Sequence, residues 1–372
     1  MKILDKFKQI DWQFYIKREV NFATEQFMHE GWIKFTKKTF KKPLLKRINY
    51  YTNGFAKIYI SQAEKSLFKN YFKNLFVKNK LNQLYIKCIN DCKKVESWLP
   101  KLSRIKYQTT SNFELVDLYS EMREKSKSLA LSLIAPRLVS LALTELENPE
   151  NKVQINTLQD KFSKLNEYRR ILTSEKLYKL WLPLFEGIGK RNNLNLNEVL
   201  FLLPQEIIDL LNNRLDRQTT KKLCEKRLKS CIYIFIDGKV DVLVKKIKKY
   251  ASDLPKDRIS KSKKVLGNCA SVGKVKAKAR LIFKANDYQK IKSGDIAVTF
   301  MTQPEISKVI DKVSGIITDE GGILCHAAII ARENNIPCLT ATQIATSILK
   351  DNDEVLLNAT EGYFIKNQSN LL

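Results

Sequence analysis

Residues 321–332 read GGILCHAAIIAR and place one of only two histidines in 372 residues directly after a Gly-Gly turn. The run AAIIA that follows His326 is typical of a buried helix, whose packing would fix the imidazole ring. The first turn of a helix carries unpaired N–H groups and the positive end of the helix dipole, and both favour an anion. A neutral imidazole is a nucleophile near pH 7, because its ordinary pKa is about 6.5. His326 is therefore a candidate phosphoryl acceptor, and a histidine that only caps the helix is the alternative.

The residues on either side of this stretch predict a compact domain. Short apolar runs bounded by Gly, Asp and Lys are typical of buried strands, and helical stretches lie between them. The expected strands are 279–283, 296–300 and 315–318, the expected helices are 304–312 and 326–334, and a closing hairpin is expected at 355–365. Together these elements indicate a β/β/α domain of a size that folds by itself.

A series of motifs runs through the same region. It comprises GNCASVG at 267–273, KARLIF at 278–283, GDIAVT at 294–299, Thr302, Pro304, IITDEGG at 316–322, and then His326, Ala327, Ala328, Arg332, Glu333, Ile336 and Pro337. In this order and spacing, residues 265–372 resemble the mobile, swivelling phosphohistidine domain of phosphoenolpyruvate synthase, pyruvate phosphate dikinase and rifampicin phosphotransferase.

The resemblance implies a role for individual residues. His326 would take a phosphoryl group from ATP and pass it to a second site. The supporting residues of the phosphohistidine loop would be Thr318, Gly321, Gly322, Cys325 and Arg332. The family usually has a threonine two residues before the histidine, where this chain has Leu324, so a hydroxyl that could contact the imidazole or the phosphate is missing there. Ala341 and Asn352 likewise stand where glycine is common.

Charge divides the chain into two parts. From Val265 onward there are 12 Lys and Arg against 11 Asp and Glu, so the preceding 264 residues carry +26 of the total charge of +27. Between the parts, residues 251–264 (ASDLPKDRISKSKK) are polar and have no hydrophobic period, which predicts a linker. A swivelling carrier needs such a tether, because donor and acceptor sites are reached by moving the domain.

The basic part, residues 1–250, is expected to be mostly helical. Aromatic residues such as Phe68 and Phe72 recur at helical spacing among lysines, which favours a core-facing stripe over a nucleic-acid contact. Asp237-Gly238 between two apolar runs predicts a hairpin near 232–244 with a type I′ turn. The expected helices include 114–124, 126–147, 153–172, 175–190 and 204–212. The predicted fold class is α+β and multidomain, with a mainly helical N-terminal domain followed by the β/β/α swivelling domain at 265–372.

A weaker resemblance extends into this helical part. Residues 168–211 are similar to the helical acceptor-binding region that precedes the carrier domain in rifampicin phosphotransferase and synthase-like proteins. Arg169, Arg170 and Arg191 are offered as anion contacts near an acceptor, because guanidinium groups bind phosphate bidentately. Their alternative role, as ordinary surface charges, is favoured.

The first 264 residues lack the Gly-rich strand and loop pattern of a nucleotide-binding domain. The resemblance therefore implies that ATP and Mg²⁺ are held by a separate ATP-grasp-type chain, and no tightly bound cofactor is expected. The seven cysteines are odd in number and scattered, and Cys88 and Cys92 make a poor zinc site, so no metal is expected. With no secretory signal and no long uncharged run, a cytoplasmic protein without membrane contact is expected.

Two function classes stay open. The favoured one is a phosphotransferase component that works with an ATP-binding partner on a small-molecule hydroxyl or enol acceptor. The other is a basic module that binds RNA or another polyanion and carries a vestigial phosphohistidine domain, which the charge permits. His326 in a nearly complete motif favours the first class and makes nucleic-acid binding a secondary expectation.

Overall fold

The structure is a computed structural model that describes residues 7, 9–18, 21–52, 55–105, 107, 109–255, 264–283, 285–302, 304–319, 321, 325–342 and 344–366. Two compact units are formed, the first comprising Met1–Gln13 and Val20–Leu254 and the second comprising Phe14–Glu19 and Pro255–Leu372. Of the predicted linker, Ala251 still ends a helix and Leu254 is buried in the first unit, whereas Lys264 begins a strand. Residues 256–263 lie outside the described residues, so their linker role stays a prediction.

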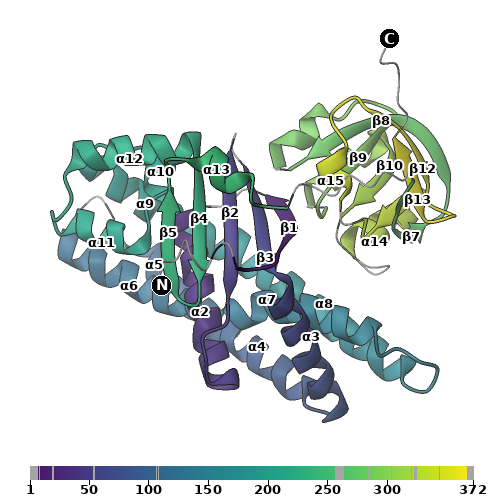
Figure 1. The fold of residues 1–372 in the computed structure, drawn as a ribbon, viewed down its shortest axis with the longest axis horizontal. Coiled ribbons are helices and arrows are strands. Elements are labelled where there is room, and N and C mark those ends of the chain that lie inside the picture. Colours follow the sequence, from purple (N-terminus) through teal and green to yellow (C-terminus); the bar gives the residue numbers. More distant parts are fainter. Residues whose placement is uncertain are drawn as a thin grey trace. The chain divides into compact units, whose positions relative to one another are not determined.

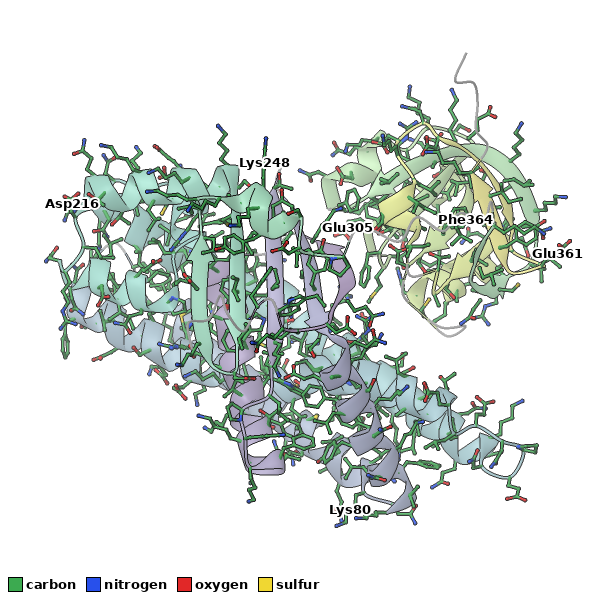
Figure 2. The ribbon with its side chains drawn as sticks, viewed as in Figure 1. Lys80, Asp216, Lys248, Glu305, Glu361 and Phe364 are labelled. Atoms are coloured by element: carbon green, nitrogen blue, oxygen red, sulfur yellow. The ribbon has the colours of Figure 1, made fainter. Side chains whose placement is uncertain are left out.

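The first unit contains strands β2 to β5 of a five-stranded sheet (Figure 1), whose side chains are drawn in Figure 2. The strands of this sheet are β1 (Trp12–Arg18), β2 (Lys46–Thr52), β3 (Phe55–Ser61), β4 (Ser230–Ile236) and β5 (Lys239–Leu243), in the order β1-β3-β2-β4-β5. β2 pairs antiparallel with β3 and β4, and β4 with β5. The predicted hairpin corresponds to β4 and β5, where Asp237 and Gly238 have the positive φ angles of 52° and 90° that a type I′ turn requires.

Three of these strands, β1 to β3, differ from the helical expectation for residues 1–230. β2 is central in the sheet, and its sequence KRINYYT mixes basic, polar and aromatic residues without a clean alternation. Its strand conformation depends on pairing with β4, which is about 180 residues away in the chain. Because that pairing is non-local, hydrophobic periodicity could not reveal it. β2 also pairs with β3, which begins at Phe55, and the sequence Asn53-Gly54 between them is a local hairpin signal that the helical prediction overlooked.

Helices make up most of the first unit, and Figure 1 shows the long ones gathered beside the sheet. Ser111 begins α6 with a capping box that includes Glu114, and Phe68 and Phe72 of α3 are buried, as the core-facing stripe predicted. The helical elements are α2 (Phe22–Phe40), α3 (Gln62–Val77), α4 (Leu81–Glu96), α5 (Leu99–Ser103), α6 (Asn112–Ser128), α7 (Ala130–Thr144), α8 (Lys152–Arg170), the π-helix η1 (Ile171–Leu177), α9 (Tyr178–Asn192), α10 (Leu196–Leu200), α11 (Pro204–Leu211), α12 (Arg217–Lys229) and α13 (Ile247–Ala251).

One helical stretch of the described chain, Asn112–Thr144, is long and apolar enough to cross a membrane by length and composition. It comprises α6 and α7, and 56% of its most apolar window is buried within the protein. Burial of this kind is typical of a core helix.

The second unit contains one eight-stranded sheet in the order β6-β13-β12-β8-β9-β10-β11-β7. Strands β8 to β11 run parallel, and the remaining strands pair antiparallel. The strands are β6 (Lys264–Leu266), β7 (Asn268–Ser271), β8 (Lys274–Ile282), β9 (Asp295–Thr299), β10 (Val313–Thr318), β11 (Cys338–Thr340), β12 (Glu354–Asn358) and β13 (Tyr363–Lys366). The helical elements are the 3-10 turns η2 (Ala285–Lys290), η3 (Pro304–Lys308) and η4 (Ile310–Lys312), and the α-helices α14 (His326–Glu333) and α15 (Ala345–Ile348).

Alternating burial along the parallel strands divides this unit into three layers. In β9, Ala297 belongs to the core cluster shared with α14, whereas Ile296 and Val298 belong to the cluster shared with β12 and β13. Ile316 and Ile317 of β10 divide in the same way. A strand whose two faces are both buried is a continuous apolar run, as observed here. The predicted fold class is confirmed, a helix-rich unit followed by a β/β/α unit.

The prediction of an α-helix at 304–312 is wrong. The structure has two short 3-10 turns, η3 and η4, in its place. Val309, with φ −132° and ψ 9°, leaves helical geometry between them. Nine residues interrupted in this way cannot form the repeated i to i−4 hydrogen bonds of an α-helix.

Candidate active site at the start of helix α14

The parallel strands of the second unit end in three buried threonines. Thr299, Thr318 and Thr340 are the last residues of β9, β10 and β11, and each is at most 4% exposed. The carboxyl ends of adjacent parallel strands meet at one edge of a sheet, where α/β proteins place their sites. His326 lies in the connection that leaves β10 at this edge and begins α14.

The imidazole of His326 is exposed, and a hydroxyl from a different connection holds one of its nitrogens. Oγ1 of Thr302 lies 3.1 Å from Nδ1 of His326. Thr302 is itself 6% exposed and follows β9, where the hydroxyl of Thr299 donates to the carbonyl of Met301 at 3.1 Å. With Nδ1 engaged by Thr302, Nε2 is the ring nitrogen at which a phosphoryl group would add.

Thr302 was not among the predicted site residues, although it stood within the matched motifs. Its hydroxyl contacts the imidazole from the connection after β9. At Leu324, where the family usually has threonine, this chain has no hydroxyl. Leu324 and Gly322 lie outside the described residues, so their predicted roles stay predictions. The signal that could have found Thr302 is its position three residues after the end of a buried strand, next to the edge at which parallel strands end.

Cys325, the residue before the histidine, is the N-cap of α14. Burial raises the pKa of its thiol, although the N–H groups of Ala328 and Ala327 lower it. The thiol is therefore neutral near pH 7 and is not a competing nucleophile beside His326. Gly321 packs against this side chain: its φ is 115°, and a Cβ there would lie 2.8 Å from Sγ of Cys325. A side chain at position 321 would displace Cys325 and strain the backbone.

Two further predicted residues occupy different places. Thr318 is fully buried, and its carbonyl accepts hydrogen bonds from the N–H and hydroxyl of Thr342 at 3.1 and 3.0 Å. Arg332 is exposed six residues after His326 on α14, and its Nε donates to the carbonyl of Ala328 at 3.0 Å. The structure thus brings Thr318, Gly321 and Cys325 to the connection before His326, and it places Arg332 about 9 Å further along the helix axis.

The three arginines offered as acceptor contacts are not grouped. Arg169 and Arg170 end α8, while Arg191 lies in α9, and α8, η1 and α9 follow one another without a break. Arg191 is 22 positions after Arg169, which corresponds to about 33 Å at the rise of an α-helix. Arg170 pairs with Glu167 at 2.6 Å on the same helix. Arg191 donates to Oδ1 of Asn112 and to the carbonyl of Tyr107, which ties α9 to neighbouring segments.

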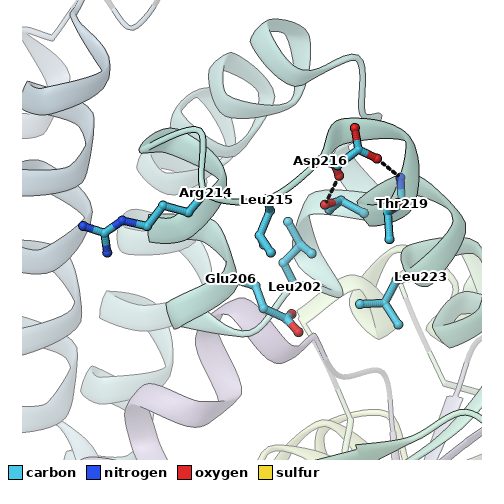
Figure 3. Close-up of a pocket in the computed structure, with 8 residues that line it drawn as sticks. Leu202, Glu206, Arg214, Leu215, Asp216, Thr219 and Leu223 are labelled. Atoms are coloured by element: carbon cyan, nitrogen blue, oxygen red, sulfur yellow. Dashed lines mark hydrogen bonds between the residues drawn. The ribbon is translucent and has the colours of Figure 1, made fainter.

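A cavity of about 190 Å³ lies between α11 and α12 of the first unit (Figure 3). Its polar groups already have structural partners: Asp216 caps α12 by accepting from the N–H of Thr219, and Glu206 forms a bidentate ion pair with Arg227. Ligand pockets usually have a volume of about 300 Å³ or more. The cavity is therefore smaller than a usual ligand pocket, and its charged groups already serve the packing of α11 and α12.

The first unit contains buried cysteines and the other histidine of the chain. Burial raises the pKa of Cys88, Cys224 and Cys231 to about 12, so these thiols are neutral. His29 lies in the middle of α2, 2% exposed, with Nδ1 3.1 Å from the hydroxyl of Tyr233. Within the described residues, no group of three or more His, Cys, Asp or Glu side chains could hold a metal ion.

A comparison with protein families gives a match that lies within the second unit. Residues 291–362 match the family described as PEP-utilising enzyme, mobile domain. This region contains β9, β10, α14 and His326, so the match covers the part of the second unit that carries the candidate site. The resemblance found in the sequence is confirmed.

Three relatives show how far the similarity reaches. The chain is 37% identical over 132 residues to a probable phosphoenolpyruvate synthase of Methanothermobacter thermautotrophicus, covering 35% of this chain and 19% of the relative. It is 36% identical over 135 residues to the phosphoenolpyruvate synthase of Neisseria meningitidis, covering 34% and 17%. It is 30% identical over 186 residues to the rifampicin phosphotransferase of Bacillus cereus, covering 48% and 20%. The chain thus matches at most a fifth of the length of these relatives.

The match to rifampicin phosphotransferase is longer than the stretch Pro255–Leu372, so it includes part of the first unit. Among solved structures, a solution structure of Enzyme I aligns with 78% of this chain and 80% of its own at 12% identity and a TM-score of 0.22. No conclusion follows from a likeness of that size.

Proposed function

We propose that this protein is a phosphotransferase component in which His326 carries a phosphoryl group. The observation that supports it best is the exposed imidazole whose Nδ1 is held by Thr302, at the start of a helix in a mobile domain of PEP-utilising enzymes. The donor is ATP bound by a separate ATP-grasp-type chain with Mg²⁺, and the acceptor is a small-molecule hydroxyl or enol. The names of the relatives, phosphoenolpyruvate synthase and rifampicin phosphotransferase, support a phosphoryl-transfer reaction.

The chemistry follows from the contact between Thr302 and His326. In the tautomer with the proton on Nδ1, this N–H donates to Oγ1 of Thr302, and the lone pair on Nε2 attacks phosphorus. The bond from Nε2 to the β-phosphorus forms while the bond from that phosphorus to the oxygen of the leaving AMP breaks. The γ-phosphate, which is transferred with it, is then released by water as inorganic phosphate, so a single phosphoryl group remains on the histidine. The Thr302 oxygen then stabilises the positive charge on the phosphorylated ring. In the second half-reaction an acceptor hydroxyl oxygen attacks phosphorus, and the P–Nε2 bond breaks with its electron pair returning to Nε2. The hydroxyl proton passes to solvent, so the imidazole is again neutral with its proton on Nδ1.

The first unit, residues 1–250, is proposed to bind the acceptor or the partner chain, and residues 251–264 to tether the moving domain. The length of the rifampicin phosphotransferase match supports a role for part of the first unit in the same reaction. Arg169, Arg170 and Arg191 remain candidates only as separate contacts, because the continuous helix separates Arg169 from Arg191.

The test is radiolabelling. The chain is mixed with its ATP-binding partner and ATP labelled at the β-phosphate, the position that the dikinase resemblance implies. We expect a phosphoprotein that is labile in acid and stable in alkali, and no label in a His326→Ala variant. Since the other histidine, His29, is buried, it serves as an internal control in the same chain. Equal labelling of His326→Ala would exclude His326 as the carrier.

The alternative, a basic RNA or polyanion module with a vestigial phosphohistidine domain, is favoured only by the charge of +26 on the first 264 residues. Binding through that charge depends strongly on salt, so it is distinguishable by measurement.

A further inference from the structure

A buried carboxylate lies where the connection to His326 begins. Asp319 directly follows β10 and is 3% exposed. The hydroxyl of Thr342 donates to its Oδ1 at 2.9 Å, and the N–H of Thr346 donates to Oδ1 and Oδ2 at 3.3 and 3.2 Å. The hydroxyl of Thr346 also donates to Oδ2. This one side chain therefore ties the end of β10 to Thr342, which follows β11, and to Thr346 of α15.

The backbone of the same residue reaches the opposite side of the site. The N–H of Asp319 donates to the carbonyl of Thr299 at 3.1 Å. Thr299 in turn fixes the turn at Met301 through its hydroxyl, and the next residue, Thr302, contacts Nδ1 of His326. The two segments that place the imidazole, one from β9 and one from β10, thus meet at Asp319.

The energetics argue that this carboxylate is not there for stability. Burial raises the pKa of Asp319 even though three donor groups of Thr342 and Thr346 lower it. A raised pKa in the folded state means that the stabilising effect is present at low pH and is lost as the pH rises through that pKa. At neutral pH, ionisation of this buried carboxylate is therefore a cost in folding free energy that its hydrogen-bond donors only partly offset. The carboxylate holds the donor groups of Thr342 and Thr346 in one fixed arrangement.

We propose that Asp319 is a positioning residue for phosphoryl transfer: it holds the start of the connection to His326 and, through Thr299, the Thr302 hydroxyl that fixes the ring. It acts through Thr342, Thr346 and Thr299 and contacts neither the phosphoryl group nor the imidazole. The proposal rests on the proposed role of His326 as carrier and adds the residue that orients it.

The experiment uses the full chain labelled with ¹⁵N-histidine. The phosphoryl donor is phosphoramidate, a small molecule that phosphorylates accessible imidazoles. With only two histidines, and His29 buried against Tyr233, the ring spectra are simple to assign. In the wild-type chain we expect phosphorylation of His326 at Nε2 only, because Thr302 holds Nδ1. In Asp319→Asn the ring is less constrained, so we expect a mixture of Nδ1 and Nε2 products and an Nε2 rate about tenfold lower, as for loss of about 1.4 kcal/mol of orientation.

The matched control is Asp295→Asn. Asp295 is equally buried, pairs with Arg280 at 2.9 Å and lies at the amino end of β9, away from the edge that carries His326. This variant should keep the wild-type product ratio even if it lowers the melting temperature. Thr346→Val, which removes one hydroxyl donor and keeps Asp319, provides a second route if Asp319→Asn does not fold, and it should shift the ratio in the same direction.

The outcomes separate the two proposals. No phosphorylation of His326 in the wild-type chain would contradict its role as carrier. Phosphorylation at Nε2 with wild-type ratio and rate in both Asp319→Asn and Thr346→Val would overturn the positioning role alone. So would an equal change of ratio in Asp295→Asn, because it would show that any buried carboxylate of the unit has this effect.

Discussion

At the scale of single residues, the hydroxyl of Thr302 is the group that the structure adds to the site. It lies 3.1 Å from Nδ1 of His326 and is contributed by the connection after β9. A neutral hydrogen bond contributes about 1 kcal/mol, with somewhat more where one partner becomes charged, as the ring does on phosphorylation.

Thr302→Val should therefore slow phosphorylation of His326 by phosphoramidate about tenfold. The initial rate is measured by ³¹P NMR on the full chain. The control is Ser314→Ala. Ser314 lies at the amino end of β10, and its hydroxyl donates to the carbonyl of Gly294. An unchanged rate in Thr302→Val would show that the hydroxyl does not orient the ring.

Ala341 is the second residue with a local consequence. The sequence has alanine where glycine is common, and the structure gives Ala341 a φ of 58°, in the left-handed region. That conformation costs a residue with a Cβ about 1 kcal/mol relative to glycine. Asn352, also at a common glycine position, has a φ of 70°, which asparagine tolerates better.

Ala341→Gly should stabilise the second unit by about 1 kcal/mol, seen as a higher calorimetric transition temperature. Asn352→Gly, the matched control, should give a smaller increase. A lower transition temperature for Ala341→Gly would mean that the greater freedom of glycine in the unfolded chain outweighs the relief of strain.

At the scale of elements, α2 packs so closely on α6 and α7 that one position has no room for a Cβ. A Cβ on Gly31 of α2 would lie 2.1 Å from the carbonyl oxygen of Lys127 and 2.7 Å from Cβ of Ala130. Alanine is favoured over glycine in a helix by about 1 kcal/mol, whereas overpacking of a core typically costs about 1–3 kcal/mol. Because the nearest obstacle is a backbone atom, the packing cost should exceed the gain.

Gly31→Ala should thus destabilise the first unit, by up to about 2 kcal/mol. All four tryptophans of the chain lie in the first 254 residues, so urea unfolding followed by tryptophan fluorescence reports on this unit. Gly187→Ala in α9 is the control, because a Cβ there would be 3.2 Å from Cβ of Tyr107. If both variants are equally stable, α2 and α6 move apart at a lower free-energy cost than the distances indicate.

At the scale of the whole molecule, the proposed transfer would require that His326 reach two sites. Deletion of residues 257–260 should slow transfer to the acceptor while phosphorylation of His326 by phosphoramidate stays at the wild-type rate. Replacement of the same four residues by Gly-Ser-Gly-Ser keeps the length and should retain the full transfer rate. If the deletion leaves transfer unchanged, movement about this segment is not required.

The charge of the molecule allows the two function classes to be distinguished. Contacts of six to ten phosphates lose affinity by roughly a thousandfold or more between 50 and 200 mM salt, whereas docking that also buries apolar surface loses less. We expect the full chain to release a short RNA at 200 mM salt and to keep its ATP-binding partner, as measured by fluorescence anisotropy and by co-elution. Submicromolar RNA binding at 200 mM salt without partner binding would make the polyanion module the better description.

The sequence by itself determined the β/β/α domain, the position of His326 at a helix start and the division of the chain by charge. Those features are written in local patterns: glycines before an apolar helix, short apolar runs, and a polar segment between parts of unlike composition. Only the tertiary structure decided that Thr302 holds the imidazole, that Asp319 joins the ends of β9, β10 and β11, and that β2 is a strand paired with β4. It also separated Arg169 from Arg191 along one continuous helical run. These features depend on contacts between residues distant in sequence, and such contacts form only when strands pair and layers pack, so no local period encodes them.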